Sequence, residues 1–213
     1  LVGVGARANK ESYTNSDYNF LRSLGNLALL SIQKTYLLEE RIEKERLEEE
    51  LTIAKSIQRG LLPDPIPESK KLDITASNIS SYQVGGDYFD ILDTPEGNLL
   101  VAIADVTGKG IPASLLMANL QSMLHVLLPI DITLGEATAR MNDIIYENTP
   151  SDKFITFFWG LFGPDRTNFK YVNAGHNPPI FLRNGSDEIE ELEEGGLILG
   201  AMPTMSPYEE STI

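Results

Sequence analysis

The feature that most constrains this chain is a charged stretch that no compact core can contain. From Glu39 to Gly60 it reads "EERIEKERLEEELTIAKSIQRG", with no Gly or Pro before Gly60 and with sparse apolar residues. Oppositely charged pairs on one helix face support such a helix in water. Prolines at 63, 65 and 67 follow, and each removes a backbone donor and restricts the residue before it. We therefore predict a long exposed helix that ends shortly before Pro63.

The apolar residues of this helix form a thin stripe. Its members near a and d spacing are Leu30, Leu37, Leu47, Leu51, Ala54 and Leu61, and it is interrupted by Gln33, Glu40, Lys44 and Gln58. A single solvated helix has the same composition. A two-stranded coiled coil would bury the stripe, and we favour it. We expect a homodimer through residues 30–61 that passes a signal to two later helices, within 112–148.

The N-terminal region reads as a strand, "LVGVG", a polar loop and a helix with Ser16 or Asp17 as its N-cap. It resembles the C-terminal end of a GAF domain. We expect residues 1–34 to be the tail of a GAF-like sensor domain and residues 35–62 to be the coiled-coil linker. The chain begins at Leu1, and "MSPYEESTI" reads as the start of a new strand, so we expect both ends to continue into a longer protein.

Charge and cysteine content exclude several classes of protein. The formal net charge of −14 argues against a nucleic-acid partner and against binding to anionic membranes. The absence of cysteine excludes disulfides, Cys-rich zinc sites and a thiol nucleophile. No apolar run approaches the roughly 18 residues of a membrane span, and no signal peptide is present. We expect a cytoplasmic protein.

From about Lys71 the pattern changes to strands, then two helices, then strands. Alternation predicts strands at "LDITASNI", "DYFDIL" and "LLVAIAD", and "TPEGN" predicts a hairpin turn between the last two. "PASLLMANLQSMLHVLL" and "LGEATARMNDIIYEN" read as helices, and "ITFFWGLF", "NFKYVNAG", "PIFLR" and "EIEEL" as further strands. This order is typical of an α+β domain.

Two acidic motifs flank the predicted hairpin. Asp87 follows Gly-Gly before the first strand, and Asp105 ends the second strand before the glycine loop "TGKG". In an antiparallel pair the start of one strand lies beside the end of the other, so the two carboxylates should meet. Adjacent carboxylates repel each other unless protons or cations neutralise them, and Mg²⁺ and Mn²⁺ prefer such oxygen ligands.

Other readings of these motifs are weaker. "GGDYF" resembles the GGDEF signature of diguanylate cyclases, but Tyr88 replaces the acidic residue and the preceding sequence leaves no room for the rest of that domain. "TGKG" lacks the spacing of a phosphate-binding loop. Asp beside Gly is also common in ordinary turns, which would explain either motif taken alone.

Five motifs together identify a family. "IQRGLLP", "VGGDYFDIL", "VAIADVTGKGIPASLLM", "FITFFWGLF" and "YVNAGHNPP" resemble the SpoIIE/RsbU-type serine/threonine phosphatases of the metal-dependent PPM superfamily, over residues 56–213. The resemblance implies an αββα sandwich within residues 63–213 and a binuclear Mn²⁺ or Mg²⁺ centre. By motif, Asp87 and Asp105 would be metal ligands that act through metal-bound water, with Asp105 bridging the ions. The backbone carbonyl of Val106 would be a further ligand.

The same resemblance implies a substrate and a limit. Family members act on phosphoserine or phosphothreonine of anti-sigma-factor antagonists in bacterial partner switching. The family carries further acidic ligands, including an Asp-Gly motif, beyond the point that resembles Ile213. We therefore expect a C-terminally incomplete metal site that binds metal weakly and hydrolyses phosphate esters poorly. A catalytically inactive binding module with the same fold is the alternative.

Four other residues invite a functional interpretation. Asp90 is expected to face away from the metals. His176, in "NAGHNPP", could donate a proton, although a structural role is favoured. His125 reads as a core or interface residue, and Trp159 with its neighbouring Phe residues as sheet core.

Overall fold

The computed structural model describes residues 3–8, 11–69, 71–80, 82–185 and 188–213. They divide into two compact units, Leu1–Leu51 and Thr52–Ile213. Helix α1 (Asn15–Arg59) has residues in both units. It is continuous across residues 34–35, where the sequence analysis placed the boundary between the GAF-like tail and the linker. The domain assignment stays a prediction.

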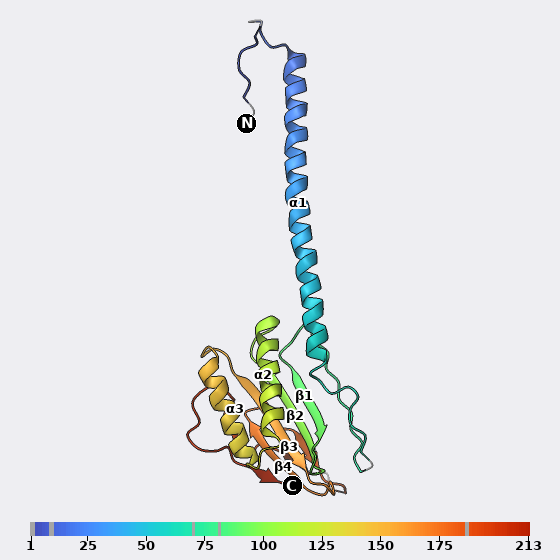
Figure 1. Cartoon of the computed structure of the whole chain (residues 1–213), viewed down its shortest axis with the longest axis vertical. Helices are drawn as coiled ribbons and strands as arrows, with labels where there is room; N and C mark the ends of the chain where they lie inside the picture. Colours follow the sequence, from blue (N-terminus) through green and yellow to red (C-terminus); the bar gives the residue numbers. More distant parts are fainter. Residues whose placement is uncertain (1–2, 9–10, 70, 81, 186–187) are drawn as a thin grey trace. The chain divides into compact units, whose positions relative to one another are not determined.

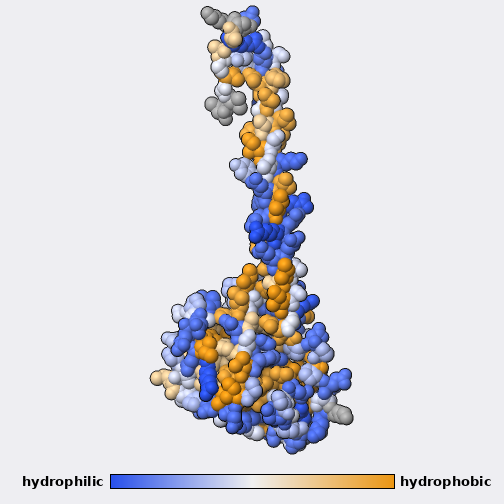
Figure 2. Space-filling view, in the orientation of Figure 1, coloured by the Kyte–Doolittle hydropathy of each residue, from blue (hydrophilic) through white to orange (hydrophobic). Residues whose placement is uncertain are grey.

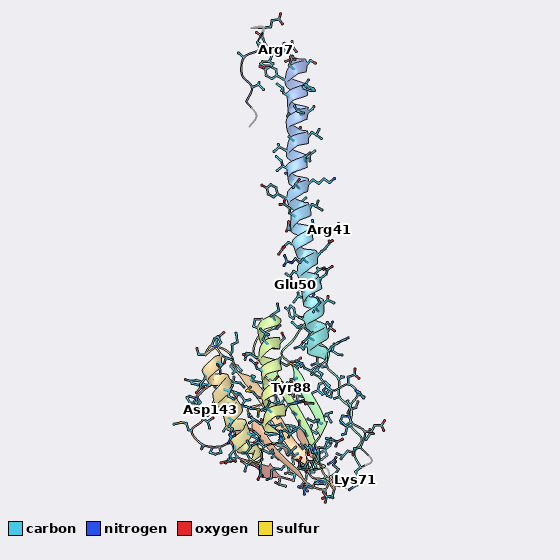
Figure 3. All side chains as sticks on the ribbon, viewed as in Figure 1. Arg7, Arg41, Glu50, Lys71, Tyr88 and Asp143 are labelled. Atoms are coloured by element: carbon cyan, nitrogen blue, oxygen red, sulfur yellow. The ribbon has the colours of Figure 1, made fainter. Side chains whose placement is uncertain are left out.

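Helix α1 has no buried residue and is exposed along most of its length, with Leu51, Ala54 and Gln58 half-buried near its C-terminal end. Side chains project from it on all sides, as Arg41 and Glu50 do in Figure 3. Arg41, Lys44 and Arg46 pair with glutamates four residues further along. As predicted, the helix ends before the prolines.

The start of α1 differs from the prediction. Thr14 caps the helix: its backbone N–H donates to Asp17 Oδ2 (2.8 Å) and its hydroxyl oxygen accepts from the Asp17 N–H (3.3 Å). The prediction of Ser16 or Asp17 as N-cap is therefore wrong, because Asp17 is the third helical residue of a reciprocal capping pair. Gly3, Val4 and Gly5 form no strand, and Leu1 and Val2 lie outside the described residues.

The second unit is built on an antiparallel meander. Strands β1 (Tyr88–Asp93), β2 (Leu99–Val106), β3 (Ile155–Phe162) and β4 (Phe169–Ala174) pair in sequence order. Strands β7 (Gly195–Gly196, parallel) and β8 (Ser211–Thr212, antiparallel) both pair with β4. Strands β5 (Ile180–Leu182) and β6 (Ile189–Glu191) form a separate hairpin.

Helices α2 (Ile111–Leu127) and α3 (Leu134–Asn148) lie side by side on one face of the main sheet (Figure 1). Pro112 stands in the first turn of α2, as expected, and a Thr133–Glu136 capping box starts α3. The core between helices and sheet includes Met117, Leu120, Met141, Phe157 and Trp159. The prediction that Trp159 belongs to the sheet core is confirmed.

The opposite face of the sheet carries a smaller cluster, in which Phe158, Phe169, Tyr171 and Leu192 are joined by Phe181 of β5. The α+β class is confirmed. A second helix layer of the predicted αββα sandwich is not represented among the elements of the described residues.

One strand predicted for the second unit is absent. Residues 72–79, "LDITASNI", alternate between half-buried and exposed, but they pair with no strand within the described residues. Alternation reports which side of a segment faces the protein, and a strand also needs a hydrogen-bonded neighbour. Among the residues that the structure describes, none of the helices is long and apolar enough to cross a membrane.

Candidate metal centre

The β1–β2 hairpin brings the two acidic motifs together. Thr94 and Asn98 close its turn, with Gly97 at φ 82°, and Tyr88 lies opposite Ala104. Asp87 and Asp105 are the next residues outward on each side of the hairpin. The expectation that they meet at one end of the sheet is confirmed, and their role as metal ligands stays a prediction.

The two carboxylates interact electrostatically. The pKa of Asp105 is raised, first by partial burial and then by the charge of Asp87. His176 opposes this shift. Two neighbouring carboxylates resist being ionised at the same time, and a divalent cation between them would stabilise the doubly ionised pair.

Gly86 allows the close approach that this arrangement needs. A Cβ at this buried position would stand 2.8 Å from the carbonyl oxygen of Val106 and 3.2 Å from the Cβ of Ala113. Only a residue without a side chain fits. The Val106 carbonyl, the third predicted ligand, thus lies against the backbone that immediately precedes Asp87.

Asp87 and Asp105 border a cavity of about 430 Å³ on the sheet face opposite the helices. Its walls include Phe89, Ile103 and residues 75–79. Asn78 Nδ2 donates to the carbonyl oxygen of Asp87 (3.1 Å). Residues 75–79 of the unpaired segment therefore form one wall of the site.

His176 lines the same cavity. The sequence left open whether this residue donates a proton or has a structural role. The Thr156 hydroxyl lies 2.9 Å from its Nδ1, and the Asn173 side chain accepts from its backbone N–H (2.8 Å) and donates to its carbonyl (3.1 Å). Partial burial lowers its pKa, although the charge of Asp105 acts in the opposite direction. The structure therefore supports both interpretations of His176: its backbone is held by Asn173, and its imidazole faces the acidic pair.

Asp90 lies on the other side of the sheet, as expected. It is buried (4% exposed) and accepts from the Tyr88 hydroxyl (2.6 Å) and from the Ile91 N–H (2.9 Å). His125 Nε2 of α2 lies 2.6 Å from the same carboxylate. The side chain of His125 is 38% exposed, so it is a polar partner of Asp90 and not a core residue. The other predicted role, an interface residue, stays a prediction.

Sequence reasoning missed Gln58. Its Nε2 donates to the Gly85 carbonyl (2.6 Å) and its Oε1 accepts from the Gly85 N–H (3.1 Å). The predicted coiled-coil seam counted Gln58 as a polar interruption, whereas the side chain instead holds the glycines before Asp87. Its position within "IQRGLLP", one of the family motifs, was the available signal.

The residues fit a divalent cation in part. Two carboxylates and a nearby carbonyl are the oxygen ligands that Mg²⁺ and Mn²⁺ take. Over the described stretches of the chain, no group of three or more acidic, His or Cys side chains gathers in a metal-binding arrangement. Asp87 and Asp105 are the two carboxylates that border this cavity, and their role as metal ligands stays a prediction.

Comparison with known proteins identifies the family. The family described as stage II sporulation protein E (SpoIIE) matches residues 95–213, which is more than half of the chain. The chain therefore belongs to the SpoIIE family. It is 29% identical over 204 residues to phosphoserine phosphatase RsbU of Bacillus subtilis (strain 168), covering 94% of this chain and 61% of RsbU. It is 27% identical over 181 residues to protein IcfG of Synechocystis, covering 72% of this chain and 28% of IcfG.

Solved structures show the same fold. The SiaA-PP2C domain of Pseudomonas aeruginosa superposes with a TM-score of 0.56 at 19% identity, covering 80% of this chain and 68% of that domain. The PP2C phosphatase domain of SpoIIE from Bacillus subtilis superposes with a TM-score of 0.53 at 19% identity, covering 61% of this chain and 38% of that one. The fold is therefore that of PP2C phosphatase domains. The chain spans about three fifths of the length of RsbU.

Proposed function

We propose that this protein is a metal-dependent phosphatase of phosphoserine and phosphothreonine in proteins. The observation that carries the proposal is that Asp87 and Asp105 lie close together at the edge of a cavity, where their negative charges repel each other. Membership of the SpoIIE family and the likeness to a phosphoserine phosphatase support it.

In this proposal Asp87, Asp105 and the Val106 carbonyl would hold Mn²⁺ or Mg²⁺ as part of a two-ion centre. Such ions would polarise phosphoryl oxygens and lower the pKa of a water molecule bound to them towards about 7. The chain's own residues shape the site around them. Asn78 and Gln58 fix the backbone on either side of Gly86. His176 supplies an imidazole, and because the pKa of His176 is lowered, its neutral form is favoured.

The substrate that we propose is a phosphorylated anti-sigma-factor antagonist in a partner-switching pathway, in the cytoplasm. The support is the likeness to RsbU. The proposal includes neither nucleic acid nor a membrane as a partner.

We also propose a GAF-like domain tail at residues 1–34 and a homodimer formed by α1. Large apolar side chains are exposed along α1, among them Leu30 (61%), Leu37 (66%) and Leu47 (52%), and Figure 2 shows apolar side chains at its surface. A partner helix would remove this surface from water.

A catalytically inactive binding module is the second candidate. The observation that favours it is the pair of carboxylates without a third acidic ligand among the described residues. Such a protein would keep the fold and recognise a phosphoprotein without hydrolysing it.

Hydrolysis of a phosphoserine protein by the full-length protein in Mn²⁺ separates the candidates. We expect turnover that stops on addition of a chelator and that is lost in Asp105→Ala. Asp131→Ala, which removes an exposed carboxylate elsewhere, should retain it. Turnover that survives Asp105→Ala would overturn the metal assignment, and Mn²⁺ binding without turnover would favour the binding module.

A further inference from the structure

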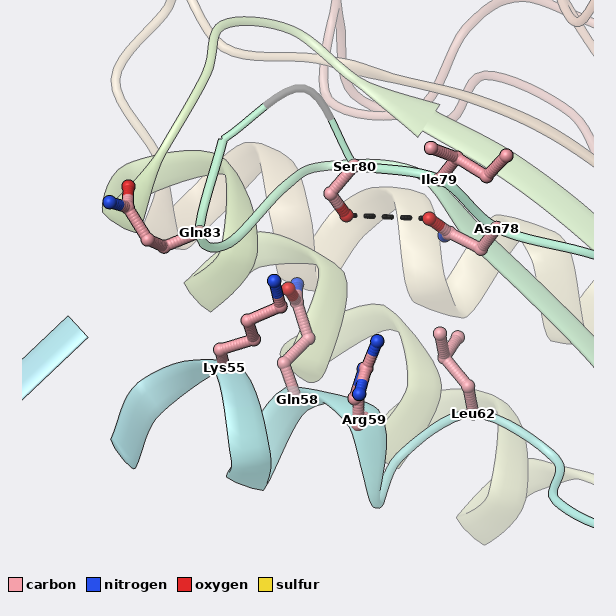
Figure 4. Close-up of a pocket in the computed structure, with 8 residues that line it drawn as sticks. All are labelled: Lys55, Gln58, Arg59, Leu62, Asn78, Ile79, Ser80 and Gln83. Atoms are coloured by element: carbon pink, nitrogen blue, oxygen red, sulfur yellow. Dashed lines mark hydrogen bonds between the residues drawn. The ribbon is translucent and has the colours of Figure 1, made fainter. Parts of the chain in front are cut away.

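A second pocket, of about 240 Å³, lies close to the candidate metal centre. The last turns of α1 contribute Lys55, Gln58 and Arg59, and the loop before β1 contributes Asn78, Ser80 and Gln83. Figure 4 shows Lys55 and Arg59 extending from α1 towards the part of the loop that carries Ser80, which donates to Asn78 Oδ1 (3.3 Å). All of these residues belong to the unit Thr52–Ile213.

The two cations of this pocket are uncompensated. Lys55 and Arg59 stand four residues apart on one helix face, where like charges destabilise a helix. Within the residues that the structure describes, neither forms an ion pair, whereas Arg41, Lys44 and Arg46 of the same helix each pair with a glutamate. No acidic side chain lines the pocket. An anion bound between Lys55 and Arg59 would relieve their repulsion.

The pocket shares a wall with the metal centre. Asn78 and Ile79 line both cavities, and Asn78 is bonded to the backbone of Asp87. Ile79 is 89% exposed, so it leaves an apolar surface between the two cavities. A peptide whose phosphoserine lies at Asp87 and Asp105 would cross Ile79 to reach Lys55 and Arg59.

We propose that Lys55 and Arg59 bind an acidic side chain of the phosphoprotein substrate, beside its phosphoserine. The inference rests on the proposed phosphatase function and adds to it a preference for phosphoserine in an acidic segment. The planar guanidinium of Arg59 suits a carboxylate, and the ammonium group of Lys55 adds a second charge. Because the chain carries a net charge of −14, most of its surface repels an acidic peptide, and the pocket sets where one can bind.

A purely structural role for the two cations makes a different prediction. Basic residues near a helix C-terminus interact favourably with the helix dipole. If that is their only role, their removal lowers the stability of α1 and leaves peptide preference unchanged.

Fluorescence anisotropy on the full chain in Mn²⁺ tests the proposal. The probes are two short labelled peptides with a phosphonate analogue of phosphoserine, which cannot be hydrolysed, flanked by glutamates in one and by glutamines in the other. We expect the glutamate peptide to bind about tenfold more tightly, the size expected of a charge-assisted contact. The variant Lys55→Gln/Arg59→Gln should lose this preference and retain its affinity for the glutamine peptide. Arg22→Gln/Lys34→Gln, which removes two exposed cations of the same helix, should keep the preference.

Equal affinity for the two peptides, no binding of either, or an unchanged preference in the pocket variant would overturn the proposal. Its failure is distinguishable from failure of the phosphatase assignment. If glutamate preference depends on Lys55 and Arg59 but the full-length protein hydrolyses no phosphoserine, the acidic-peptide pocket stands and the enzyme assignment does not.

Discussion

The side-chain amide of Gln58 holds the backbone of Gly85 through two hydrogen bonds, from Nε2 to the carbonyl (2.6 Å) and from the N–H to Oε1 (3.1 Å). This contact joins the last turn of α1 to the glycines that precede Asp87. It makes the end of the helix a direct support of the candidate metal centre.

We expect Gln58→Ala to lower the free energy of unfolding by about 1–3 kcal/mol, because both polar atoms of the Gly85 peptide lose a partly buried partner. Urea denaturation measures this loss, and Mn²⁺ titration should show weaker binding. Gln33→Ala, at an exposed position of the same helix, is the control. Equal stability of the two variants would show that the hydrogen bonds between Gln58 and Gly85 contribute nothing to the free energy of unfolding.

Asp105→Asn should separate stability from metal binding. Without metal, the melting temperature should stay the same or rise, because the repulsion between Asp87 and Asp105 is removed. Addition of Mn²⁺ should raise the melting temperature of the wild-type protein by mass action and leave that of the variant unchanged. Asp131→Asn should respond as the wild type does. A variant that Mn²⁺ still stabilises to the wild-type extent would contradict the ligand assignment.

Gly86→Ala tests the close approach at Val106. The new Cβ would meet the Val106 carbonyl oxygen at 2.8 Å, so the hairpin must shift, at a cost of about 1–3 kcal/mol in unfolding free energy. Gly85→Ala is the matched control, because its Cβ would meet only the Ser80 side chain, at 3.3 Å. Thermal denaturation of both variants checks the order. A smaller loss at Gly86 than at Gly85 would refute the packing argument.

The proposed dimer predicts a change of mass. Leu47→Lys/Leu51→Lys places charges in the predicted seam, and light scattering should show the mass falling by half. Ile42→Lys/Ile53→Lys adds the same charge at exposed positions outside that seam and should leave the mass unchanged. If the seam variant keeps the wild-type mass and activity, the coiled-coil assignment is wrong.

A hydrogen bond from Tyr171 predicts a pH dependence. It lowers the pKa of Glu194 below its ordinary value of 4.5. Burial, and after it the same hydrogen bond, raises the pKa of Tyr171 to about 12. Because the folded-state pKa of Glu194 is depressed, its contribution to stability is present above about pH 4.5 and is lost as the pH falls through the folded value.

Glu194→Gln should therefore be less stable than the wild type at neutral pH, and the difference should shrink on acidification. Denaturation at several pH values measures it, with Glu193→Gln as the exposed neighbouring control. A difference that is constant across pH would exclude the charge of Glu194 as its cause.

Local signals in the sequence were sufficient for much of the second unit. The turn "TPEGN" and the alternating segments on either side predicted the β1–β2 hairpin, and pairing of that hairpin is enough to bring Asp87 beside Asp105. Pro112 and the helical spacing after it predicted α2, and the prolines after Gly60 predicted the end of α1. These features depend on neighbours within a few residues, which is the range over which sequence periodicity and turn chemistry act.

Contacts between distant segments needed the tertiary structure. Gln58 meets Gly85 across 27 positions, and His176 meets Thr156 across 20. Both contacts depend on how whole elements pack, so no local periodicity encodes them. Residues 72–79 have the alternation of a strand, but the described residues offer no neighbour to complete its hydrogen bonds. The sequence by itself determined the hairpin and its two carboxylates through local backbone preference, and packing between elements decided which side chains surround them.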